Sequence, residues 1–363
     1  MATLDDLPLR DDLRGKKPYG APMIPVRYAL NVNENTHPVP PTVRAAITDA
    51  LAHALETINR YPDREFTQLR ENLADYASRH HQGSAISPDM VWAANGSNEV
   101  LHHVLQAFGG PGRAVLGFPP TYSMHPIIAE ATGTRWVTGQ REEDFSLTPT
   151  GVVQAIEAAK PDLVFFCAPN NPTGTPVSLE TIRAAYDATP GIVLVDEAYV
   201  EFLPDGTPTA SDLLRGRERL LISRTMSKAF AFAGARVGYL IADPAVIDAL
   251  RLVRLPYHLS ALTQAAAVAA LKHQDIMLQM VADIRTQRDR LLRELPDMGY
   301  PTAYSEANFV LFGGVPNPQE LFEQLLQHDI LIRDVGIPHH LRVTAGTEAE
   351  TSYFLSTLAT LTA

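Results

Sequence analysis

Two periodicities of hydrophobic residues alternate along most of this chain. Short runs that are apolar at nearly every position predict buried strands at 91–93, 114–117, 163–168, 192–195, 220–223 and 237–241. Between them, apolar residues recur every three or four positions and predict helices at 98–108, 151–159 and 179–188. Buried strands that alternate with helices are typical of an α/β fold, in which helices cover both faces of a mostly parallel sheet.

The two ends of the chain follow other patterns. Residues 1–40 are rich in proline and polar residues and lack periodicity, whereas helical patterning covers about 41–58 and 66–80. Beyond Tyr257 the pattern predicts a long helix at 261–295, a strand at 308–312, a helix at 319–328, strands at 330–333 and 341–344, and a helix at 348–361. We therefore expect a large domain at 41–275, a smaller α+β domain at 276–363, and an N-terminal arm at 1–40 that packs with the small domain.

Composition places the chain among ordinary globular proteins. Its 363 residues suffice for two packed domains, and 45% of them are hydrophobic and 20% charged. The formal net charge of −11 argues against binding to nucleic acid or to an anionic membrane. No apolar stretch approaches the roughly 18 residues of a membrane span, and the N-terminal residues lack the apolar core of a signal peptide. A cytoplasmic protein is therefore expected.

Cysteine and histidine usage argues against a metal centre and against a thiol mechanism. Cys167 is the single cysteine, so the chain cannot form an internal disulfide, and its apolar neighbours predict a buried strand residue. Adjacent histidines such as His102 and His103 are not three or four positions apart, as two ligands on one helix would be. We expect no metal site.

Polar residues gather directly after the predicted strands. In an open α/β sheet, ligands bind at the carboxyl ends of the strands, so these segments are the candidate site. They are residues 95–98, 120–122, 170–174, 196–199 and 223–228.

Lys228 follows one of these strands, and small residues separate it from Arg236. A lysine at the end of a buried strand is costly to ionise, so its pKa can fall and its amine can form a Schiff base with a carbonyl compound. The alternative is a structural lysine that pairs with a carboxylate at the rim of the sheet. Lys228 alone does not decide between the two.

Asp196 ends the next apolar run upstream, and Tyr199 lies in the loop that follows it. A carboxylate here needs a cationic partner, and the protonated nitrogen of a pyridine ring fits; the alternative is a cap on the next helix. Asn171 lies in a segment whose composition indicates a turn, and the amide of Asn171 could also reach a ring oxygen.

A phosphate position is indicated where Ser97 and Asn98 open a predicted helix. The free N–H groups and the dipole of a helix N-terminus favour an anion. Thr225, Ser227 and Arg236 could add two hydroxyls and a guanidinium to the same anion.

Together and in this order, these segments resemble the fold-type I aminotransferases of the class I and II group, which depend on pyridoxal 5'-phosphate (PLP). The resemblance covers nearly the whole chain and rests on Ala-Pro-Asn-Asn-Pro-Thr-Gly at 168–174, Val-Asp-Glu-Ala-Tyr at 195–199 and Ser-Arg-Thr-Met-Ser-Lys-Ala-Phe at 223–230. Within that group the chain is similar to the histidinol-phosphate aminotransferases of the actinobacterial type. The supporting segments are residues 7–10, 19–22, 59–63, 93–99, 255–260 and 331–334.

The resemblance implies a role for each cofactor residue. Lys228 carries PLP as a Schiff base, and Asp196 pairs with the pyridine nitrogen. Asn171 and Tyr199 hold the phenolic oxygen, and Tyr122 stacks on the ring. The implied phosphate ligands are Ser97, Asn98, Thr225, Ser227 and Arg236, together with Tyr61 from the partner subunit of a homodimer.

The resemblance also implies the substrate residues. Arg342 grips the anionic group of the substrate, and the residues expected nearby are Tyr19, Asn33, Tyr257, Asn308 and Arg333. One departure concerns the substrate entrance. The family often has Asn-Glu-Asn-Pro followed by an aromatic residue, whereas here Asn-Glu-Asn at 33–35 is followed by Thr-His-Pro.

The resemblance implies a transfer of the amino group between glutamate and imidazole-acetol phosphate, which yields 2-oxoglutarate and histidinol phosphate in histidine biosynthesis. Arg342 suits both substrates, because a guanidinium pairs with a carboxylate or a phosphate. Three alternatives stay open: an aromatic amino acid aminotransferase, whose pocket Tyr19, Tyr122 and Tyr257 could line, a PLP-dependent decarboxylase of a phosphorylated amino acid, and a PLP-binding regulatory domain.

Overall fold

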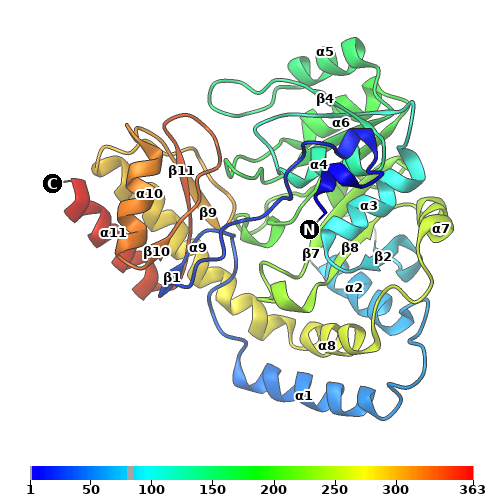
Figure 1. Cartoon of the computed structure of the whole chain (residues 1–363). Coiled ribbons are helices and arrows are strands. Elements are labelled where there is room, and N and C mark those ends of the chain that lie inside the picture. The colour runs from blue at the N-terminus through cyan, green and yellow to red at the C-terminus, as the bar shows by residue number, and fades with distance from the viewer. Residues whose placement is uncertain (1, 80–84, 363) are drawn as a thin grey trace.

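A computed structural model describes residues 2–79 and 85–362, and these residues form one seven-stranded sheet and two two-stranded sheets (Figure 1). The order in the large sheet is β2-β8-β7-β6-β5-β3-β4. Strands β4, β3, β5, β6 and β7 run parallel, whereas β8 is antiparallel to both neighbours. The mainly parallel sheet expected from the sequence is thus confirmed. The strands are Val91–Ala94 (β2), Ala114–Gly117 (β3), Arg135–Thr138 (β4), Leu163–Cys167 (β5), Ile192–Asp196 (β6), Leu220–Thr225 (β7) and Gly238–Ile241 (β8).

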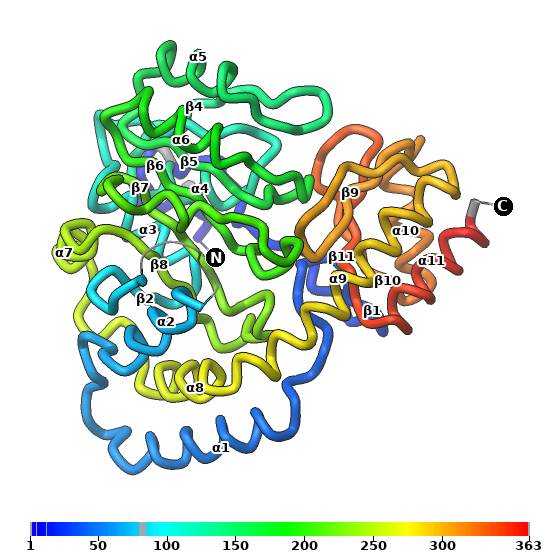
Figure 2. The backbone as a smooth tube through the Cα atoms, turned by 180° about the vertical axis from the view of Figure 1, so that it is seen from behind, coloured from blue at the N-terminus to red at the C-terminus, as the bar shows by residue number. Residues whose placement is uncertain are grey.

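Helices α5, α6, α7 and α8 each begin at a residue whose side chain caps the first turn. The Ser178 hydroxyl accepts a hydrogen bond from the Thr181 N–H at 3.0 Å, and the Asp243 carboxylate accepts one from the Ala245 N–H at 2.9 Å. Helix α1 packs along α8 on one side of the molecule, as both views show (Figures 1 and 2). The helices are Pro41–Leu55 (α1), Thr67–Arg79 (α2), Ser97–Phe108 (α3), Met124–Ala131 (α4), Pro149–Ala159 (α5), Leu179–Ala188 (α6), Pro244–Val253 (α7) and Ala261–Lys272 (α8).

The C-terminal part of the chain lies at one side of the large sheet and carries the two small sheets (Figure 2). Strand β9 pairs antiparallel with β11, and β1 from the N-terminal arm pairs parallel with β10. The elements are Tyr28–Ala29 (β1), Gln274–Asp297 (α9), Phe309–Phe312 (β9), Pro318–Gln327 (α10), Ile330–Leu331 (β10), Leu341–Thr344 (β11) and Glu348–Thr362 (α11).

One of the sequence-based expectations needs correction, and several elements were not predicted. The long helix predicted at 261–295 is two helices, because His273 leaves helical geometry (ψ 27°) and caps the end of α8 and the start of α9. The apolar period resumes directly afterwards and hides the break. Helices α4 and α7 and strand β4 were not predicted; β4 is an edge strand without a fully buried residue, so its sequence lacks a continuous apolar run. The predicted helix end at His80 lies outside the described residues.

The N-terminal arm contacts two separate regions. Tyr28 and Ala29 pair with β10, whereas Lys16 forms an ion pair with Glu130 of α4, beside the large sheet. Domain boundaries at 40 and 275 stay a prediction. None of the helices in the described part of the chain combines the length and the hydrophobicity that crossing a membrane requires.

Leu194 and Leu4 offer a test of where the stability of the fold resides. Leu194 lies in β6 with no exposed surface, whereas the side chain of Leu4 is 64% exposed. Leu194→Ala should lower the free energy of unfolding by about 2–5 kcal/mol, because it leaves a cavity in the core. Leu4→Ala should change it by no more than about 0.5 kcal/mol. Urea unfolding at one protein concentration measures both, and equal losses would contradict this account of the core.

Candidate active site

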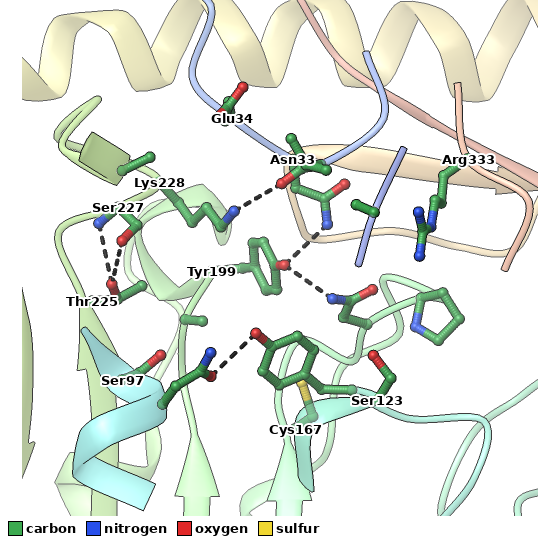
Figure 3. Close-up of a pocket in the computed structure, with 18 of the residues that line it drawn as sticks. Asn33, Glu34, Ser97, Ser123, Cys167, Tyr199, Thr225, Ser227, Lys228 and Arg333 are labelled. Carbon is green, nitrogen blue, oxygen red and sulfur yellow. Dashed lines mark hydrogen bonds between the residues drawn. The ribbon is translucent and has the colours of Figure 1, made fainter. Parts of the chain in front are cut away.

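A pocket of about 580 Å³ opens at the carboxyl ends of the parallel strands (Figure 3). Residues from the large sheet, the N-terminal arm and the C-terminal part all line it, although they are far apart in the sequence. Most of the site residues expected from the sequence are among them: Tyr19, Asn33, Ser97, Asn98, Tyr122, Asn171, Asp196, Tyr199, Thr225, Ser227, Lys228, Arg236, Arg333 and Arg342.

Lys228 places its amine in this pocket just beyond the end of β7. Its Nζ donates a hydrogen bond to the backbone carbonyl of Val32 at 2.9 Å, and this carbonyl belongs to the N-terminal arm. Burial, and next to it the nearby charge of Arg342, lower the pKa of Lys228 to about 8 against the opposing effect of Glu34. A large fraction of the amine is therefore neutral, and able to act as a nucleophile, in slightly basic solution.

Asp196 ends β6 and is 1% exposed at the floor of the pocket. Its Oδ2 lies 3.1 Å from Nε2 of His125, whose side chain is fully buried on α4. Its Oδ1 is buried and has no hydrogen-bond partner among the described residues. A carboxylate oxygen in this situation is costly unless a cation or a donor reaches it, so the site is suited to a ligand with a positively charged or protonated nitrogen.

Tyr199 and Arg342 are joined through amide side chains. The Tyr199 hydroxyl accepts hydrogen bonds from Nδ2 of Asn171 at 3.2 Å and from Nδ2 of Asn33 at 3.0 Å. Arg342 donates from Nη1 to Oδ1 of Asn171 at 2.5 Å and from Nη2 to the carbonyl of Asn31 at 2.7 Å. Burial lowers the pKa of Arg342 to about 10, so its guanidinium remains charged near neutral pH and available to an anionic ligand.

The N-terminus of α3 and Arg236 form an anion position on the other side of the pocket. The Arg236 guanidinium donates from Nη2 to the carbonyl of Asn95 at 3.4 Å, next to Gly96. Gly96 has a φ of 86°, and a Cβ there would stand 2.3 Å from Nη2 of Arg236, so only glycine permits this approach. Backbone N–H groups at the start of a helix together with a guanidinium favour a phosphate.

Hydroxyl groups complete this anion position. Thr225 Oγ1 and Ser227 Oγ lie 3.0 Å apart and both residues line the pocket. Tyr122 donates from its hydroxyl to Oδ1 of Asn98 at 3.2 Å, which fixes its ring between α3 and α4. Apart from Tyr61, the phosphate ligands and the ring-stacking residue expected from the sequence therefore line one pocket.

Three expected residues do not line the pocket of this chain. Tyr61 and Tyr257 stack on one another with ring centroids 4.4 Å apart, and they are 81% and 40% exposed. Asn308 is buried behind the pocket, where its Nδ2 donates to the carbonyl of Asn33 at 3.0 Å. Their contacts with cofactor or substrate stay a prediction.

Sequence reasoning missed His125 and the backbone carbonyls of Asn31 and Val32. His125 lies three positions after Tyr122, in a segment that follows a strand, and this position was a usable signal. The two carbonyls leave no mark in the sequence, because every residue carries one. They take part in the site because the N-terminal arm crosses the pocket (Figure 3).

Comparison with known proteins agrees with this geometry. The family model described as aminotransferase class I and II matches residues 28–358. The chain is 57% identical over 361 residues to a histidinol-phosphate aminotransferase of Paenarthrobacter aurescens, with 99% of this chain and 96% of the relative covered. It is 53% identical over 360 residues to a histidinol-phosphate aminotransferase of Thermobifida fusca, with 99% and 97% covered.

Solved structures show the same fold. The crystal structure of histidinol-phosphate aminotransferase from Sinorhizobium meliloti, in complex with pyridoxal-5'-phosphate, superposes with a TM-score of 0.82 at 26% identity. The match covers 93% of this chain and 91% of that chain.

The pKa of Lys228 gives a test that needs no ligand. In the folded, ligand-free chain, acylation of Lys228 should be half-maximal near pH 8, because only the neutral amine reacts. In urea the midpoint should move up towards the ordinary lysine pKa of 10.5, since burial is lost. Mass spectrometry of the Lys228 peptide over a pH series measures both. Identical midpoints in the folded and unfolded chain would contradict the lowered pKa.

Proposed function

This chain belongs to the class I and II aminotransferase family, and we propose that it exchanges an amino group between L-histidinol phosphate and 2-oxoglutarate. Glutamate and imidazole-acetol phosphate are the other pair of the reversible reaction, which serves histidine biosynthesis. The names of the Paenarthrobacter and Thermobifida relatives support this substrate pair. The observation that carries the chemistry is one pocket that holds a lysine amine of lowered pKa and a buried carboxylate oxygen with no partner among the described residues.

The residues present fit PLP as the cofactor. The unpaired Oδ1 of Asp196 suits the protonated nitrogen of a pyridine ring, and the N-terminus of α3 with Arg236 suits the phosphate. The amine of Lys228 suits the aldehyde, and Tyr122 lies where an aromatic ring would be covered. When bound, PLP carries the amino group between the two substrates and accepts electrons while the proton on carbon is moved.

The residues of the chain perform the proton transfers and the orientation. Lys228 Nζ, once neutral, takes the proton from the substrate carbon that bears the amino group. Asp196 would hold a proton on the ring nitrogen through its Oδ1, and Nε2 of His125 lies 3.1 Å from the other oxygen of the carboxylate. Tyr199 and Asn171 would orient the ring oxygen, and hydrogen bonds within the chain fix both of these side chains.

Arg342 is the proposed grip for the anionic end of both substrates. A guanidinium donates two parallel hydrogen bonds to a carboxylate or to a phosphate, so one residue serves glutamate and histidinol phosphate in turn. The Arg342 side chain lines the pocket, and its Nε is buried and has no hydrogen-bond partner among the described residues. Arg333 lines the same end of the pocket and adds a second positive charge there.

The proposal includes a homodimer in the cytoplasm, with Tyr61 of each copy reaching the phosphate end of the other active site. The exposure of Tyr61 and its stacking on Tyr257 support this, because a large aromatic pair at the surface suits a protein interface. The division into a large domain at 41–275 and a small domain at 276–363 belongs to the same proposal.

A second candidate is transamination of aromatic amino acids. Tyr19 and Tyr122 line the pocket and would pack against a phenyl ring as well as against an imidazole. The relatives' names favour histidinol phosphate.

Turnover of two keto substrates decides between these candidates. With glutamate as donor, kcat/KM for imidazole-acetol phosphate should exceed that for phenylpyruvate by at least ~10-fold, because a phosphate presents more negative charge to Arg342 and Arg333 than the single carboxylate of phenylpyruvate does. Lys228→Ala should lower turnover of either substrate by at least ~10²-fold, since the proton-transfer group is lost. Preference for phenylpyruvate would overturn the substrate, and substantial multiple turnover in Lys228→Ala would overturn the chemistry.

Arg342→Lys tests the grip on the anion. The variant keeps the charge but loses the paired hydrogen bonds, so kcat/KM should fall about 10- to 100-fold for glutamate and for histidinol phosphate alike. Arg293→Lys is the matched control, because the Arg293 side chain is 66% exposed and lies outside the pocket. Steady-state kinetics of both variants provide the measurement. A loss confined to one of the two substrates would show that Arg342 does not serve both.

A further inference from the structure

The Tyr199 hydroxyl is held from two sides, and one of the two donors comes from the N-terminal arm. Residues 31–34, which we call the strap, cross the pocket between the large sheet and the C-terminal part (Figure 3). Within the strap, Asn33 donates from Nδ2 to the Tyr199 oxygen at 3.0 Å, opposite the Asn171 amide at 3.2 Å. Asn33 is 1% exposed and Tyr199 is 4% exposed, so little water competes for these bonds.

The two donors decide the direction of the Tyr199 proton. A phenol oxygen has two acceptor positions and one proton, and here both acceptor positions are filled by amide N–H groups. The proton must therefore point in a third direction, and no acceptor for it exists among the described residues. Tyr199 lines the pocket, so its hydroxyl is left as a donor to a ligand. Burial raises the pKa of Tyr199, which keeps the proton on the oxygen.

Asn33 is itself fixed so that its amide nitrogen faces Tyr199. The Thr344 hydroxyl oxygen accepts from the Asn33 backbone N–H at 3.1 Å, and the same hydroxyl donates to Oδ1 of Asn33 at 3.3 Å. Since Oδ1 is engaged by a donor, the other end of the amide is Nδ2. Asn308 donates to the Asn33 carbonyl at 3.0 Å, and the backbone of Asn33 has a φ of 58°. These contacts leave the side chain one orientation.

We infer that Asn33 is a positioning residue that acts through Tyr199, fixing the hydroxyl as a donor towards the ring oxygen of the cofactor. Asn308 supports Asn33 in turn, because its side chain donates a hydrogen bond to the backbone carbonyl of Asn33. This assignment rests on the proposed PLP chemistry. It differs from the expectation drawn from the family resemblance, in which Asn33 and Asn308 contact the substrate.

The strap also links the Tyr199 hydroxyl to Arg342, the residue proposed to bind the anionic group of the substrate. Arg342 donates to the carbonyl of Asn31, two residues before Asn33, and to the side chain of Asn171 on the other side. Lys228 donates to the carbonyl of Val32 between them. Arg342, Asn171, Tyr199 and the strap therefore form a closed ring of contacts around the place where the cofactor and the substrate meet.

The absorbance of bound PLP reports on this arrangement without turnover. Tyr199 stabilises negative charge on the ring oxygen, so a weaker Tyr199 donor should raise the pH at which the Lys228-bound cofactor loses its proton. Asn33→Gly removes the amide and tolerates the positive φ of this position. Its absorbance pKa should rise by roughly half a unit or more, the amount expected for one hydrogen bond. The charged groups that line the pocket are unchanged in this variant: Lys228, Arg236, Arg333, Arg342, Glu34, Asp196 and Asp334.

Asn35→Ala is the matched control. Asn35 follows the strap and is buried, but it donates to the carbonyl of Ala229 and has no bond to Tyr199. Its absorbance pKa should stay at the wild-type value. Circular dichroism and thermal unfolding of each variant verify the fold.

A double-mutant cycle of Asn33→Gly with Tyr199→Phe tests whether Asn33 changes the absorbance pKa through the Tyr199 hydroxyl. If Asn33 acts through the Tyr199 hydroxyl, Asn33→Gly should shift the absorbance pKa in the wild-type background and leave it unchanged in the Tyr199→Phe background. An equal shift in both backgrounds would overturn the inference, as would no shift in either. A raised KM in Asn33→Gly with an unchanged absorbance pKa would assign Asn33 to substrate binding instead. A wild-type chain that fails to bind PLP would overturn the proposed function together with this inference.

Discussion

The burial of Asp196 is the constraint on which the rest of the site depends. A carboxylate at the end of a central strand, 1% exposed, is stable only if both oxygens are compensated. His125 on α4 meets one oxygen at 3.1 Å, and the other has no partner among the described residues. A ligand with a protonated nitrogen would therefore stabilise the Asp196 carboxylate at the carboxyl edge of the large sheet. The amine of Lys228 and the anion position at α3 surround the space that such a ligand would fill.

Parallel strands explain how residues from distant segments share one pocket. Each strand delivers the residues that follow it to the same edge, so Asn171 after β5, Tyr199 after β6 and Lys228 after β7 meet there. The N-terminal arm and β11 then close the pocket from the opposite side, with Arg342 bonded to the carbonyl of Asn31. The site is built from the large sheet, the N-terminal arm and the C-terminal part of the chain. The strap contacts both the residues that follow the large sheet and the residues of β11.

The buried parallel strands and the polar residues that follow them could be predicted from the sequence. Fully buried strands such as β5 and β6 have continuous apolar runs, and polar residues directly after them belong to the carboxyl edge. The edge strand β4 has no buried residue, so it was not predicted. The break between α8 and α9 was not predicted either, because only His273 leaves the helix and the helical spacing of apolar residues continues on both sides of it. The hydrogen bond from Asn308 to a backbone carbonyl 275 positions away was not predicted, because no local pattern encodes such a pairing.

The most direct test of the central claim is to locate the covalent bond between PLP and the chain. The chain is loaded with PLP, reduced with borohydride, digested and sequenced by mass spectrometry, so that the reduced linkage marks the lysine that carried the cofactor. The account predicts the mark on Lys228, the lysine whose amine lies in the pocket with Asp196. A stoichiometric mark on Lys16, Lys17, Lys160 or Lys272, or no mark at all, would contradict it.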